Sequence, residues 1–137
     1  MSHRDDLDAV REEFRPPTAR EREILDFLLC VDAVGIAELR EQAAFARVAR
    51  WSCGCASFNV VVDRERAPRS VITTSPAVEA FSTERDDADK AFDLLLWVED
   101  GWLAGVEIVD FVARHGEDSP REIPPREYWG SPQARQS

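Results

Sequence analysis

Apolar and polar residues alternate in the segment 92–111, FDLLLWVEDGWLAGVEIVDF, and this pattern predicts two β-strands joined by a tight turn at an Asp-Gly pair. A two-residue loop would pair Glu99 with Trp102 and would mix charged and apolar side chains on both faces of the hairpin. A three-residue loop with Gly101 in a bulge pairs Val98 with Trp102 and gathers the charges on one face. Because one face of a hairpin is normally buried, the sequence predicts the three-residue loop.

This register gives the hairpin a charge-free face, which is expected to be core, and a mixed face that is a candidate contact surface. The alternative is that a loop or the C-terminal tail covers the mixed face, and the aromatic pair at 128–129 would then anchor the tail to it. The charge-free face comprises Phe92, Leu94, Leu96, Val98, Trp102, Ala104, Val106 and Ile108, and the candidate interaction surface comprises Leu95, Trp97, Leu103, Glu107, Tyr128 and Trp129.

Two helices are predicted upstream of the strands. Thr18 and Glu21 form a capping-box pattern directly after a double proline, and apolar residues recur with helical spacing from 24 to 31. A second, alanine-rich helix is predicted over 36–46. Alternation then predicts strands within 47–62, 71–74 and 77–82.

These elements predict an α+β fold in which two N-terminal helices pack on one face of a four- to five-stranded antiparallel meander. Residues 1–17 are expected to form a polar N-terminal arm and residues 18–125 a single α+β domain. Residues 126–137 are expected to form an extended or disordered tail.

The charge balance narrows the choice of partner. The 137 residues carry a formal net charge of −10. Phosphate contacts need clustered Lys and Arg, so neither nucleic acid nor an anionic membrane surface is expected as a partner. A basic protein partner suits this charge, and an exposed edge strand or the mixed hairpin face would allow a homodimer. The sequence has no secretion signal and no membrane-length apolar run, which predicts a cytoplasmic protein with reduced thiols.

The segment Cys53-Gly54-Cys55 is the motif with the most chemical character. Two thiolates one residue apart can supply half of a tetrahedral zinc site, and Cys30, His3 and His115 are the remaining candidate ligands. The alternative is a tight turn in which both cysteines pack as small apolar side chains. That alternative is favoured, so no cofactor is expected.

Catalysis is not expected. The chain has no phosphate loop, dinucleotide fingerprint, nucleophile elbow or HExxH motif. Asp93, Glu107 and Asp110 lie on or near the mixed hairpin face, where an apolar neighbourhood could raise a carboxyl pKa. That spacing is unspecific and solvated charges on a strand are far commoner, so a non-catalytic protein is favoured over an enzyme.

Four segments carry a resemblance: TAREREILDFLL at 18–29, ELREQ at 38–42, WSCGCAS at 51–57 and LLLWVEDG at 94–101. Over roughly residues 15–125 the chain resembles small uncharacterised bacterial proteins of the high-GC, actinobacterial type. The resemblance implies no activity and no site residues.

Three classes of function follow from these features. The favoured class is a small, acidic, cytoplasmic protein-interaction protein of immunity or regulator type, and an inhibitor of a basic toxin is one concrete form of it. The second is a small-ligand-binding domain with a pocket between helices and sheet. The third is a thiol or zinc protein centred on Cys53 and Cys55.

Overall fold

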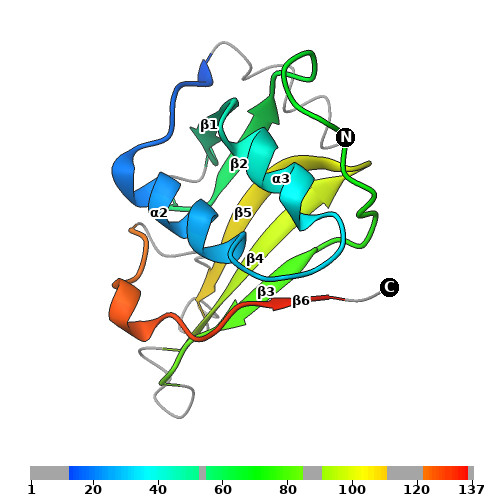
Figure 1. The fold of residues 1–137 in the computed structure, drawn as a ribbon. Coiled ribbons are helices and arrows are strands. Elements are labelled where there is room, and N and C mark those ends of the chain that lie inside the picture. Colours follow the sequence, from blue (N-terminus) through cyan, green and yellow to red (C-terminus); the bar gives the residue numbers. More distant parts are fainter. Residues whose placement is uncertain (1–12, 53–54, 85–90, 111–121, 136–137) are drawn as a thin grey trace.

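The computed structural model describes residues 13–52, 55–84, 91–110 and 122–135. It is an α+β structure with two helices and a six-stranded antiparallel sheet in the order β1-β2-β5-β4-β3-β6. Both helices lie in front of the sheet in Figure 1. The helices are α2 (Ala19–Leu28) and α3 (Ile36–Ala43), and the strands are β1 (Ala46–Arg50), β2 (Phe58–Val62), β3 (Val78–Phe81), β4 (Phe92–Glu99), β5 (Trp102–Asp110) and β6 (Gln133–Ala134).

The predicted capping box starts α2. The Thr18 hydroxyl accepts a hydrogen bond from the Glu21 backbone N–H at 3.2 Å, and the Glu21 carboxylate accepts one from the Thr18 N–H at 2.8 Å. Each bond satisfies an N–H group that has no partner within the helix. The apolar stripe of α2 is buried as its spacing predicts, with Ile24, Leu25 and Leu28 inaccessible to solvent.

The hairpin between β4 and β5 has a two-residue loop, so the predicted three-residue loop is wrong. Asp100 and Gly101 both have positive φ angles, 54° and 85°, as a type I′ turn requires, and Glu99 pairs with Trp102. The register then shifts, because Val98 pairs with Leu103 whereas Trp97 pairs with Gly105. Ala104 is the extra residue of a β-bulge, and the bulge, not the loop, separates the charged face from the apolar one.

Near the turn, the hairpin residues are distributed between the two faces of the sheet differently from the prediction. Leu94, Leu96, Val106 and Ile108 are fully buried, as predicted for the charge-free face. Leu103 also enters the core, at 3% exposure, although it was predicted for the mixed face. Trp102 and Ala104 were predicted to be core, and they are only partly buried. Between the turn and the bulge the side chains point to the opposite faces from those expected for a three-residue loop, and beyond the bulge they return to the predicted faces, which explains all three differences.

The sheet is larger than the predicted four or five strands, and its order is not that of a meander. β2 pairs with β5 rather than with β3, so β4 and β5 lie at the centre. The sixth strand comes from the predicted tail, where β6 pairs with β3 after a 3-10 helix at Arg126–Tyr128. This pairing satisfies backbone groups on the outer edge of β3 that would otherwise be unpaired.

The N-terminal segment and the C-terminal segment both attach to the sheet or to α2. Arg15 forms an antiparallel bridge with Val48 of β1, through backbone bonds of 2.9 and 2.7 Å. Trp129 packs against Phe27 of α2 with ring centroids 5.0 Å apart, and it belongs to the buried core. None of the helices in the described residues is long and apolar enough to cross a membrane.

Gln42 of α3 joins the helix layer to the hairpin. Its fully buried amide donates hydrogen bonds to the carbonyl oxygens of Pro68 and Gly101, both at 2.8 Å, and accepts one from the Leu103 N–H at 2.9 Å. Gly101 and Leu103 flank Trp102 at the start of β5. The amide therefore holds the end of the hairpin beside α3.

We expect Gln42→Leu to destabilise the fold by about 3 kcal/mol, because it leaves the Leu103 N–H and the Pro68 carbonyl without their partner in a dry environment. Urea unfolding followed by circular dichroism measures this loss. Glu41→Leu, one residue earlier on the exposed side of α3, is the matched control and is expected to change the free energy of unfolding little. Equal stability of the two variants would contradict this role of the amide.

Candidate functional site

The face of the sheet that points away from the helices carries the candidate site. Ala49 pairs with Asn59, Asn59 with Gly105, and Gly105 with Trp97, so these residues form one row across β1, β2, β5 and β4. Directly paired residues share a face, and the next residues along, including Val60 and Val106, belong to the helix-side core. The row therefore lies on the opposite face.

A hollow of about 400 Å³ lies on this row. Two indole side chains, Trp51 and Trp97, contribute to its wall, and Asn59 and Gly105 lie between them in the strand order. A Cβ added to Gly105 would lie 2.9 Å from the Phe58 carbonyl oxygen, so a larger residue fits poorly there. The absent side chain helps to leave the space open in the middle of the row.

Neither indole has an N–H available to a ligand. Trp97 Nε1 donates to Glu107 Oε1 at 3.0 Å, which fixes the ring beside the carboxylate. Trp51 Nε1 is inaccessible to solvent and has no acceptor among the described residues. A ligand in the hollow would therefore meet ring surface and not indole N–H groups.

The charged groups of the hollow are acidic. Glu99 and Glu107 contribute to its lining, and no Lys, Arg or His does so among the described residues. An anionic ligand would meet carboxylates and electron-rich ring faces, both of which repel it. The hollow therefore suits a cation or a neutral apolar group.

The structure brings together only part of the predicted interaction surface. Leu95, Trp97 and Glu107 are partly buried and lie on this face, where Leu95 is paired with Glu107. Leu103 does not, because the bulge turns it into the core. Trp129 and the adjacent Tyr128 pack with the helix-side core, so the predicted anchoring of the tail to the mixed face is wrong.

Sequence reasoning missed Trp51, Asn59 and Gly105. Their contribution depends on the pairing of β2 with β5, which joins residues more than 40 positions apart. The signal available in the sequence was the two-residue spacing of Ala49 and Trp51, which would place both on one face if the extended backbone of β1 continues to Trp51. This hollow lies on the opposite face of the sheet from the pocket that was predicted between helices and sheet, which stays a prediction.

The cysteines do not assemble into a metal site in the described residues. Cys55 is disulfide-bonded, which differs from the expected reduced thiols, and a disulfide sulfur is not the thiolate that zinc binds. Cys30, another of the candidate ligands, is exposed and free. No group of three potential ligands occurs among the described residues, and Cys53, His3 and His115 lie outside them.

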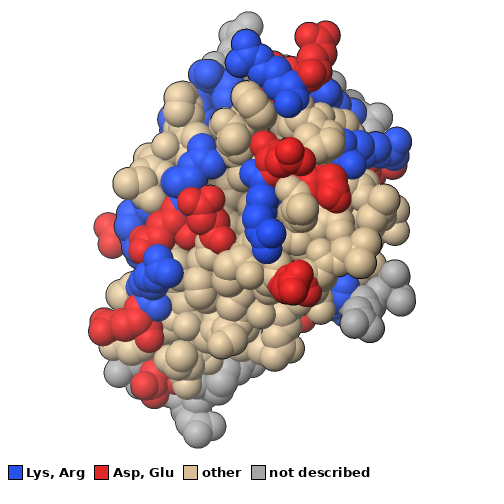
Figure 2. Space-filling model, in the orientation of Figure 1, with Lys and Arg blue, Asp and Glu red and all other residues tan. Residues whose placement is uncertain are grey.

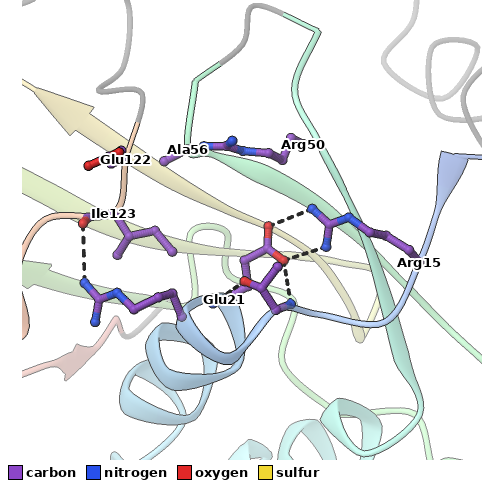
Figure 3. Close-up of a pocket in the computed structure, with 8 residues that line it drawn as sticks. Arg15, Glu21, Arg50, Ala56, Glu122 and Ile123 are labelled. Atoms are coloured by element: carbon purple, nitrogen blue, oxygen red, sulfur yellow. Dashed lines mark hydrogen bonds and ion pairs between the residues drawn. The ribbon is translucent and has the colours of Figure 1, made fainter.

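A second hollow, of about 340 Å³, lies at the start of α2 (Figure 3). There the Arg15 guanidinium makes two hydrogen bonds to the buried Glu21 carboxylate, at 2.6 and 3.1 Å. Arg20 donates to the carbonyl oxygens of Ile123 and Pro124. These cations bond to groups of the chain itself, so we interpret the second hollow as structural.

The helix side of the molecule has no single-sign character. Figure 2 shows Arg side chains interspersed with Asp and Glu side chains over this face. Such a mixture gives weak long-range attraction for either sign of partner. The hollow lined by Trp51 and Trp97 differs from this face, because its charged lining residues among those described are all acidic.

Comparison with protein-family models, with curated proteins and with solved structures finds no match for the chain. Its function is therefore inferred from the residues of the site.

The Arg15–Glu21 pair gives a pH-dependent contribution to stability. Burial raises the pKa of Glu21, but hydrogen bonds from Arg15 and Thr18 and the charge of Arg15 outweigh it, so the pKa lies below its ordinary value. A carboxyl group with a lowered pKa stabilises the fold above its ordinary pKa. This contribution is lost as the pH falls through the lowered value.

We expect Glu21→Gln to lower the free energy of unfolding by about 2 kcal/mol at neutral pH. The difference from the unsubstituted protein should shrink in acid, where Glu21 is itself protonated. Urea unfolding across the acidic range measures this. Glu23→Gln, which removes the exposed ion pairs to Arg20 and Arg126, is the control with a smaller expected effect. A difference that stays constant with pH would contradict the assignment.

Proposed function

We propose that the protein is a non-catalytic interaction protein that binds a basic protein partner through the sheet face opposite the helices. The observation that carries this proposal is the hollow itself, where two indole rings and two carboxylates gather without a basic side chain among the described lining residues. Tryptophan is enriched at protein interfaces because it offers a large, rigid contact area.

The charge of the whole chain supports the same kind of partner. A formal net charge of −10 attracts a basic protein over a distance of about one Debye length and accelerates association. Once the partner is in contact, the affinity depends on the apolar and aromatic side chains of the face. An immunity-type inhibitor of a basic toxin, or a regulator acting in the cytoplasm, is the form of this function that we favour.

A second candidate function is the binding of a small molecule in the same hollow. Its volume of about 400 Å³ is the observation that favours it, because ligand pockets commonly measure about 300–1,000 Å³. A small ligand would be expected to saturate the hollow without contacting Leu95, two residues from Trp97 along the strand. A protein partner would contact both.

A random peptide library panned on the protein tests the proposal. We expect the retained peptides to be rich in Lys and Arg, and we expect Trp97→Ala to weaken their binding at least tenfold (about 1.4 kcal/mol). Fluorescence polarisation of a labelled selected peptide measures the affinity, which should fall with added salt.

Trp102→Ala is the matched control, because Trp102 lies on the same hairpin and does not contribute to the hollow. Selected peptides without basic residues would contradict the proposal. Equal affinity for the unsubstituted protein and for Trp97→Ala would also contradict it.

A further inference from the structure

The four tryptophans of the chain differ in what lies over their rings. The Arg64 guanidinium lies 5.0 Å from the ring centroid of Trp102, and those of Arg20 and Arg126 lie 5.5 and 5.8 Å from that of Trp129. These are cation–π distances. No guanidinium is stacked in this way on Trp51 or Trp97 among the described residues, and these are the two tryptophans of the hollow.

Resting on the proposed function, we infer that the hollow receives one arginine side chain of the basic partner. Its guanidinium would stack on the ring surface of Trp97 or Trp51 and pair with the Glu107 carboxylate. The arginine of the partner would then form, between two chains, the same cation–π contact that Trp102 and Trp129 form with arginines of their own chain.

The geometry of Glu107 fits this role. One carboxylate oxygen accepts the Trp97 N–H at 3.0 Å, and its second oxygen has no bond to a described residue. A guanidinium is planar, so it can lie against an indole face while its edge donates to a carboxylate. The ring and the carboxylate are already held together before the ligand arrives, which lowers the ordering cost of binding.

The contact would be partly shielded from water. Trp97 and Glu107 are both partly buried, and the hollow is recessed into the sheet at Gly105. Cation–π contacts and ion pairs are stronger where solvent is partly excluded than on an open surface. An arginine at this position would therefore add affinity beyond that of a charge on the rim.

The test uses the unsubstituted protein with N-acetyl-arginine N-methylamide as the probe. Its citrulline analogue has nearly the same shape without the charge. Two-dimensional NMR of the indole N–H groups follows all four tryptophans separately. We expect the arginine probe to shift the Trp51 and Trp97 signals saturably while those of Trp102 and Trp129 stay in place, and we expect the citrulline analogue to bind about three- to thirtyfold more weakly.

Three variants locate the contact. Glu107→Gln keeps an acceptor for the Trp97 N–H and removes the charge. It should therefore lower the affinity for the arginine probe and leave the affinity for the citrulline analogue unchanged. Trp97→Phe should lower the affinity for the arginine probe less than Trp97→Leu does, because phenylalanine keeps a ring face.

Equal binding of the two probes would overturn the inference and would identify a neutral ligand site. Failure of the arginine probe to shift either indole signal would also overturn it. The interaction function would still stand in that case if the selected peptides lose affinity in Trp97→Ala. If those peptides also bind the variant unchanged, the interaction function fails as well.

Discussion

The hydrogen bonds of Gln42 fix the start of β5, and the rest of the sheet depends on where β5 starts. Its amide bonds to Gly101 and Leu103, on either side of the first residue of β5, and to Pro68 in the segment before β3. The hairpin has one pairing register next to the turn, where Val98 pairs with Leu103, and another beyond it, where Trp97 pairs with Gly105. The register changes because Ala104 is inserted between Leu103 and Gly105. A bulge needs its flanking residues fixed if the strand is not to slip. The buried amide supplies that fixation from the helix layer.

The same bulge links the core to the candidate site. It places Leu103 among the buried side chains, and two positions later it places Gly105 in the row between Asn59 and Trp97. The apolar side of the hairpin can therefore be fully packed while the opposite side keeps a recess. A regular strand in the turn register would have moved Glu107 toward the core, where a carboxylate without a partner is costly.

The sequence predicts the parts of this structure that depend on neighbouring residues. The capping box at Thr18 and Glu21, the buried stripe of α2 and the burial of Leu94 and Leu96 all follow from local spacing. The bulge was predicted at Gly101 and not at Ala104, because a two-residue loop followed by one inserted residue has the same face alternation beyond it as a three-residue loop. The contributions of Trp51 and Asn59 were missed because they require strand pairing between distant segments, which spacing along the chain does not encode.

The two hollows differ in what bonds to their carboxylates: an arginine in the hollow at the start of α2, and an indole N–H in the hollow on the sheet face. At the start of α2, Glu21 is buried, and Arg15 and Thr18 supply its hydrogen bonds, so the site is neutralised from within and joins the N-terminal segment to the helix. At the sheet face, the partner of Glu107 among the described residues is an indole N–H, which orients the carboxylate without cancelling its charge. A partly buried carboxylate beside an unstacked ring attracts a cation more strongly than either group alone. Of the two hollows, the one beside Trp97 therefore has the residual charge that a basic partner would recognise.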